Sequence, residues 1–121
     1  MPSLEELLGA FTRVRGVTAA VLAGSDGLVL HSAMRPDAEV DGDAIGAVAS
    51  SGIVPAQELG QEVGRGRLVQ SVLEYEKGVV LIEPIDDGAI LAVVANHVAN
   101  LGLVRLTVRR LRGQLLAAIT E

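Results

Sequence analysis

Two histidines and three aspartates are the side chains that could supply acid–base chemistry or hold a metal ion. His31 and His97 each stand alone, without a second histidine or a glutamate at the short spacing of zinc sites. Asp26, Asp86 and Asp87 precede turn glycines, where aspartate stabilises a tight turn by bonding its own backbone. We therefore favour strand-end positions for the histidines and turn positions for the aspartates over catalysis or metal binding.

Two further motifs resemble chemical sites. Gly64-Arg65-Gly66-Arg67 has the glycines of a phosphate loop, but such loops run from a strand into a helix, and here a helix is expected before the motif and a strand after it. Ser50-Ser51-Gly52 lacks the Gly-x-Ser-x-Gly frame that exposes a nucleophilic serine. The chain has no cysteine, which excludes thiolate nucleophiles and disulfides. We predict a protein that is not an enzyme and that uses no cofactor or metal.

A stripe of arginines is the remaining polar feature. Arg105, Arg109 and Arg112, with Arg110 alongside, recur at helical spacing near the end of the chain. The stripe could bind phosphate or an acidic partner. Alternatively it is the solvated face of a helix whose other face carries leucines, and cations suit the C-terminal half of a helix dipole. We favour the solvated face.

Hydrophobic periodicity defines the elements that must position these residues. Helices are predicted over residues 3–14, 44–63 and 100–119, and strands over residues 17–23, 28–32, 68–75, 79–85 and 89–95. Turn signals join the first two strands as a hairpin and the last three as a meander. This order predicts one α/β (α+β) domain over residues 1–121, with a five-stranded antiparallel sheet flanked by helices.

The central helix has an unusual composition. Between Ala44 and Gln57 there is no charged residue, and small side chains dominate. Because depletion of charge marks the core of an interface, we expect a second subunit to pack on this helix. Pro55 removes a backbone donor, which predicts a kink or a break near Ser51. The strand over residues 68–75 should lie at a sheet edge, either paired with a second subunit or covered by a loop.

Overall composition limits the possible partners and compartments. Half of the residues are hydrophobic and the mean hydropathy is +0.44, yet the longest apolar run, Ala89–Ala95, is far shorter than the roughly 18 residues that cross a bilayer. Glu5 and Glu6 stand where a signal peptide would be basic. We therefore predict a cytoplasmic protein without membrane insertion. A net charge of −5 disfavours nucleic acid.

The ordered set of motifs resembles a known family. It consists of Gly16-Val17, Ser25-Asp26-Gly27, Glu83-Pro84-Ile85 before an Asp-Gly turn, the apolar strand over residues 89–95, and Asn100-Leu101-Gly102-Leu103-Val104-Arg105 at the start of the last helix. This set is similar to the roadblock (dynein light chain) family, particularly to its bacterial, MglB-like members.

The resemblance implies a profilin-like sandwich and a homodimer in which the central helices lie together and the sheets join across the third strand. It also implies a small Ras-like GTPase as partner, whose hydrolysis some members activate. The expected dimer interface comprises Ile45, Val48, Ala49, Gly52, Val69, Ser71 and Leu73. The expected partner-binding residues are Ala47, Ser50, Ser51 and Val54. The alternative is a small-ligand sensory domain of profilin-like fold, against which the scarcity of aromatic residues counts.

Overall fold

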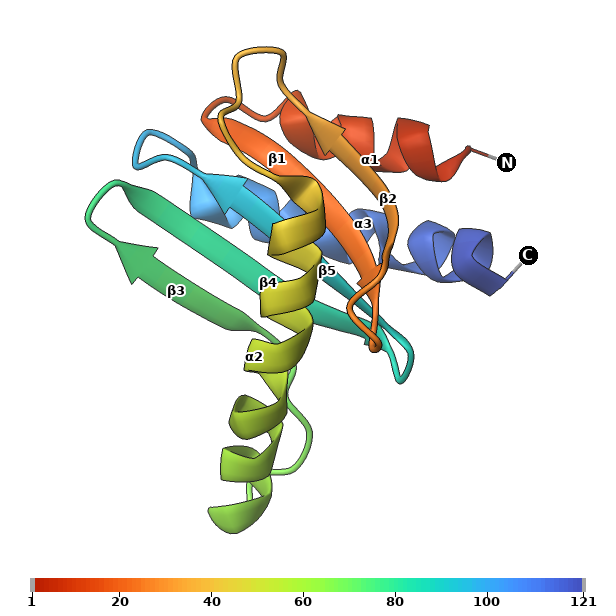
Figure 1. Ribbon diagram of the computed structural model, residues 1–121, viewed down its shortest axis with the longest axis vertical. Coiled ribbons are helices and arrows are strands. Elements are labelled where there is room, and N and C mark those ends of the chain that lie inside the picture. The colour runs from red at the N-terminus through yellow and green to blue at the C-terminus, as the bar shows by residue number, and fades with distance from the viewer. Residues whose placement is uncertain (1, 121) are drawn as a thin grey trace.

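The computed structural model describes residues 2–120 of the 121-residue chain (Figure 1). The elements are α1 (Leu4–Thr12), β1 (Val17–Gly24), β2 (Val29–Met34), α2 (Gly42–Glu62), β3 (Ser71–Tyr75), β4 (Gly78–Asp86), β5 (Ala89–Ala95) and α3 (Leu101–Thr120). The five strands form one sheet in the order β2-β1-β5-β4-β3, and every neighbouring pair is antiparallel. The predicted fold class and element order are confirmed.

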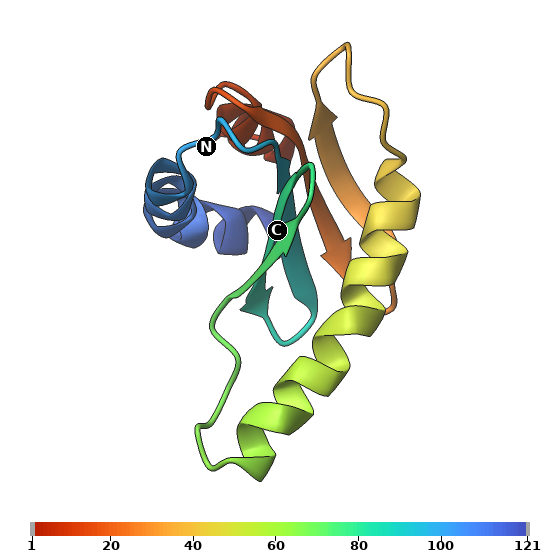
Figure 2. The same cartoon turned by 90° about the vertical axis from the view of Figure 1, so that its left-hand side faces the viewer.

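Helices cover both faces of the sheet, as Figure 2 shows: α1 and α3 pack on one face and α2 crosses the other. The larger core lies under α1 and α3, where Leu8, Phe11 and Leu115 pack on Leu22 and Leu91 of the central strands. Phe11 is the one aromatic side chain buried there, so aliphatic packing supplies nearly all of this core.

The core under α2 is smaller and is made of small side chains. Ala49 and Ile53 of α2 pack on strand residues that include Ala23 and Ile90. Gly46 allows the helix to lie close to the sheet, because a Cβ at this position would lie 2.8 Å from Cγ2 of Val29. The small residues that set α2 apart in the sequence therefore allow its N-terminal half to approach the sheet closely.

Local sequence signals operate as predicted at the helix start and at the turns. Glu6 N–H donates to Oγ of Ser3 at 3.1 Å, which completes the capping box of α1. The Asp26 carboxylate accepts from Leu28 N–H at 3.0 Å, and the Asp86 carboxylate accepts from Gly88 N–H at 2.7 Å. Asp26 and Asp86 thus form the two turns that the sequence assigned to them.

The predicted break in the central helix is wrong. The helix α2 runs without interruption through Pro55, as Figures 1 and 2 show. Proline cannot donate to the carbonyl of Ser51, four residues earlier. Because both residues are exposed, water can satisfy that carbonyl and the helix continues.

The third strand begins later than expected, at Ser71 rather than Leu68. Leu68 N–H donates to Oε1 of Gln57 on α2 at 3.2 Å, so its backbone is engaged by the helix and not by the ladder with β4.

Among residues 2–120, no helix is long and apolar enough to cross a membrane.

Candidate functional site

An apolar groove of about 470 Å³ lies between α2 and β3 on the face that α2 covers. None of its lining side chains is charged: Ala44, Ile45, Val48, Ala49, Gly52, Ile53, Ala56, Ser71, Leu73, Tyr75, Val80, Ile82 and Val94. We call this feature the apolar groove. One wall is a helix of small residues and the floor is the edge of the sheet, so another helix could approach both closely.

The structure brings six of the seven expected dimer residues to this groove. They are Ile45, Val48, Ala49, Gly52, Ser71 and Leu73. Val48 has 71% of its surface exposed, whereas Ala49 lies beneath the helix at 6%. Val69 is highly exposed but lies outside the apolar groove, because it precedes the strand.

Sequence reasoning missed Tyr75 in the apolar groove. Ser71, Leu73 and Tyr75 alternate along β3 and line the same cavity. That alternation is the signal that could have identified the tyrosine. The strand itself pairs with β4 and stands at the end of the sheet order, so its other edge has no strand partner within the described chain (Figure 1).

Three of the four expected partner-binding residues are exposed on α2. Ala47, Ser51 and Val54 face solvent. Ser50 does not: it is buried, and the single proton of its hydroxyl is shared between the carbonyls of Gly24 at 3.0 Å and Gly46 at 2.7 Å. The helical period places Ser50 on the sheet side of α2, so it lies outside the exposed surface where we expected it.

A second cavity, of about 980 Å³, opens beside the apolar groove. It lies between the C-terminal half of α2, the connection over residues 63–70, the end of β4 and the arginine face of α3. We call it the polar cleft. Its lining side chains are mostly polar or charged, and they include four arginines: Arg67, Arg105, Arg109 and Arg112.

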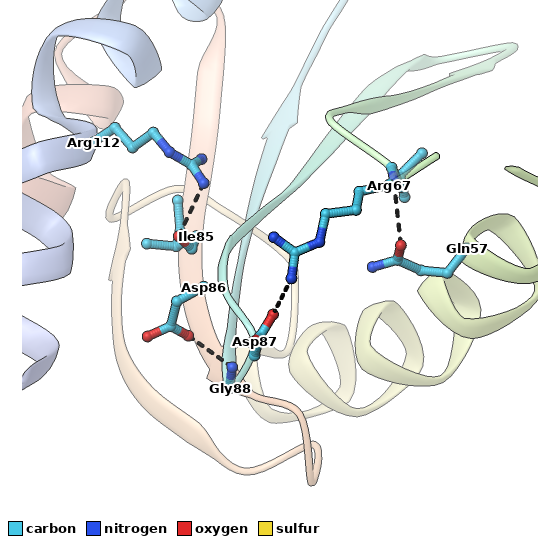
Figure 3. Close-up of polar contacts among 8 residues, drawn as sticks. Gln57, Arg67, Ile85, Asp86, Asp87, Gly88 and Arg112 are labelled. Atoms are coloured by element: carbon cyan, nitrogen blue, oxygen red, sulfur yellow. Dashed lines mark hydrogen bonds and ion pairs between the residues drawn. The ribbon is translucent and has the colours of Figure 1, made fainter. Parts of the chain in front are cut away.

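Arg112 anchors α3 to the end of β4. Its guanidinium donates to Oε2 of Glu83 at 2.7 Å and to the carbonyl of Pro84 at 2.8 Å. It also donates to the carbonyl of Ile85 at 2.9 Å, the contact that Figure 3 shows. Glu83 is only 7% exposed whereas the Arg112 side chain is 43% exposed, so the ion pair joins a buried carboxylate to a half-exposed guanidinium. The solvated-face interpretation is therefore wrong for Arg112, whose position in the helix directs it to the strand end.

The Glu83 carboxylate also belongs to a chain of hydrogen bonds that reaches Arg105. Gln70 donates to Oε1 of Glu83 at 3.1 Å, and Arg105 Nε donates to Oε1 of Gln70 at 2.8 Å. These contacts tie the connection before β3 to α3.

By contrast, Arg67 and Asp87 pair at 3.0 Å with both side chains in solvent, as Figure 3 shows. Such exposed pairs contribute little to stability.

The remaining chemical candidates stay separate in space. His31 lies on β2 at one sheet edge, and His97 Nε2 donates to the Glu76 carbonyl at 2.7 Å beside the turn that follows β3. Among residues 2–120, no three histidine, cysteine, aspartate or glutamate side chains gather as metal ligands. The connection over residues 64–67 follows α2 and leads toward β3, as its sequence order indicated.

Comparisons with known proteins agree with this architecture. An uncharacterized protein, MJ0310, of Methanocaldococcus jannaschii is 33% identical over 107 residues, covering 88% of this chain and 91% of that relative. The Roadblock/LC7 domain from Streptomyces avermitilis has a TM-score of 0.78 at 27% identity, covering 95% of this chain and 99% of the other. The gliding protein MglB from Thermus thermophilus has a TM-score of 0.79 at 24% identity, covering 88% and 81%.

The likeness to MglB, at this identity, establishes a shared fold. The relative from Methanocaldococcus is archaeal, and the expected bacterial origin stays a prediction. The sequence profile described as the Roadblock/LC7 domain matches residues 3–95, most of the chain. Together with the archaeal relative, this match shows that the chain belongs to the Roadblock/LC7 family.

Proposed function

We propose that the protein is a non-catalytic, homodimeric regulatory or scaffold subunit that binds a small Ras-like GTPase. The observation that carries the proposal is the apolar groove, an uncharged surface formed by α2 and the free edge strand β3. An exposed apolar surface beside an unpaired strand edge favours association with another chain. Membership of the Roadblock/LC7 family and the MglB-like fold support a GTPase as the further partner.

Self-association through the apolar groove would bury Val48 of both protomers. Fully burying a valine stabilises by about 1.5–3 kcal/mol, and Val48 is 71% exposed in the single chain. Two copies thus contribute roughly 2–4 kcal/mol of the dimerisation free energy. Val48→Arg removes this contribution and places a charge against uncharged side chains. The dissociation constant should rise at least about thirtyfold.

Sedimentation velocity over a micromolar concentration series tests the dimer. Wild type should sediment as a dimer, and Val48→Arg should shift toward monomer with an unchanged far-UV circular dichroism spectrum. Val98→Arg is the matched control, because Val98 is 63% exposed and lies outside the groove. A monomeric wild type, or a dimer that tolerates Val48→Arg as well as Val98→Arg, contradicts the interface.

The exposed residues Ala47, Ser51 and Val54 remain the proposed contact for the GTPase. Affinity capture from a native extract, with GTP or GDP added, should enrich a small GTPase in one nucleotide state. Val54→Arg should lose it, and Val98→Arg should retain it. GTP hydrolysis by the purified GTPase, measured with and without the dimer, then separates activation from tethering. Absence of any GTPase among the captured proteins argues against this part of the proposal.

A small-ligand sensory role is the second candidate, and the polar cleft is the observation that favours it. A cavity of about 980 Å³ is large enough for a metabolite, and arginines line one wall. Thermal-shift measurements with nucleotides and small carboxylic acids test this role. A saturable rise in the melting temperature would favour a sensor, and no rise with any compound would favour the subunit role.

A further inference from the structure

The helix α3 concentrates positive charge in an acidic protein. It carries four arginines and no acidic residue, whereas the whole chain has a net charge of −5. Arg105 and Arg109 stand one turn apart and both line the polar cleft. We call them the arginine pair. Like charges four residues apart on a helix repel each other, so this arrangement costs free energy unless a negative group lies nearby.

Four carboxylates line the cleft beside its four arginines, and ion pairs engage two of these carboxylates. Glu83 is engaged by Arg112, and Asp87 by Arg67. The Asp86 carboxylate accepts from its own turn backbone. Within the described part of the chain, neither member of the arginine pair forms an ion pair. The arginine pair therefore stands on the α3 wall without an ion-pair partner, and the two carboxylates of the lining that form no ion pair with residues 2–120, Glu58 and Asp86, stand on α2 and at the end of β4.

The opposite wall of the cleft is partly apolar. Val54 of α2 and Val69 of the connection are 52% and 75% exposed, and Ile53 and Leu68 lie beside them. An inorganic anion would leave this wall uncovered, and the cleft is much larger than such an ion. A protein segment that carries both carboxylates and an apolar side chain fits the two walls together.

We propose that the polar cleft binds a protein segment in which aspartate or glutamate residues flank an apolar side chain. The carboxylates contact the arginine pair, and the apolar side chain packs on Val54 and Val69. This inference rests on the proposed function in that the segment belongs to a protein partner. It adds a second contact to the exposed face of α2, because Val54 belongs to both surfaces.

Fluorescence anisotropy with a labelled synthetic peptide, a leucine flanked by glutamates, tests the cleft directly. The wild-type protein should bind it, more weakly at high salt, because exposed charges are screened within about 10 Å at 0.1 M salt. The peptide with glutamine in place of glutamate should bind roughly tenfold more weakly, since each of the two exposed charge contacts contributes up to about fivefold.

Arg109→Glu tests the contribution of the arginine pair to peptide binding without breaking an internal contact, because the Arg109 side chain makes no hydrogen bond or ion pair with residues 2–120. It should weaken peptide binding about tenfold or more, since reversal replaces an attraction by a repulsion. The double variant Arg105→Glu/Arg109→Glu should abolish it. Arg110→Glu is the matched control, because Arg110 is exposed on the same helix but does not line the cleft.

Three results would overturn the cleft assignment. Equal losses in Arg109→Glu and Arg110→Glu would show a diffuse attraction to the helix. Equal binding of the glutamine peptide would show that the carboxylates do not contribute to the interaction. Displacement of the peptide by inorganic phosphate at micromolar concentration would show a small-anion site. If the cleft variants bind peptide normally while Val54→Arg still loses the captured GTPase, the cleft assignment fails and the proposed function stands.

Discussion

Removal of the Arg112 guanidinium is the sharpest test of how α3 is attached to the sheet. Arg112→Met keeps most of the aliphatic stem but deletes the donors to Glu83, Pro84 and Ile85. The Glu83 carboxylate would stay buried with Gln70 as its remaining donor. A buried charge that loses its partner is strongly destabilising, because neither water nor a counter-charge replaces the lost interaction.

The expected loss of stability is moderate. Breaking a buried ion pair costs about 3–5 kcal/mol, but the Arg112 side chain is 43% exposed, so water already screens part of the interaction. We expect the free energy of unfolding to fall by about 2 kcal/mol and the melting temperature by about 8 °C for a domain of this size. Glu83→Gln removes the buried charge and keeps an acceptor, so the double variant Arg112→Met/Glu83→Gln should recover about 1 kcal/mol.

Urea denaturation followed by circular dichroism measures both quantities. All variants must be compared at one protein concentration, because dimerisation makes the apparent stability depend on concentration. If Arg112→Met unfolds like the wild type, the ion pair does not hold α3 in solution. If the double variant loses the sum of the two single losses, the penalty is not that of a stranded buried charge, and the reasoning is refuted.

Three further substitutions test individual positions by the same urea titration. Gly113→Ala should stabilise by about 0.5–1 kcal/mol, because its Cβ would meet no atom within 4 Å in a helix interior; a loss would show an unrecognised contact. Gly78→Ala should destabilise by about 3 kcal/mol or more, since Gly78 has φ 154° and the added Cβ would strike the carbonyl oxygen of Ala95. Wild-type stability of this variant would contradict the backbone conformation at Gly78. Ser50→Ala should cost about 1 kcal/mol through the lost bond to the Gly24 carbonyl at 3.0 Å, and no change would show that the bond is not formed in solution.

Local chemistry explains why most of the fold could be predicted from the sequence. The capping box of Ser3 and Glu6 and the turns at Asp26 and Asp86 depend on neighbours within three residues. Aliphatic runs between such signals identify the strands, and β5 occupies the predicted range, Ala89–Ala95. These features need no knowledge of which elements meet in space.

The mispredicted features depend on tertiary contacts. Whether Pro55 breaks α2 depends on the exposure of the Ser51 carbonyl, which the sequence does not state. The start of β3 depends on Gln57, eleven residues before Leu68. The role of Arg112 depends on how α3 is placed against the end of β4. Each outcome is decided by a contact between elements, where local propensity carries no information.

The length of α2 gives a further argument that the single chain is not the whole functional unit. Its buried residues end at Ile53, yet the helix continues to Glu62 and extends past the sheet in Figure 1. A short helical segment without packing is marginal in water. The connection that follows α2 contacts one side of this extension, where Arg65 N–H donates to the Gly60 carbonyl at 2.8 Å. On this extension Leu59 is 63% exposed, so we expect the same partner that covers the apolar groove to cover it.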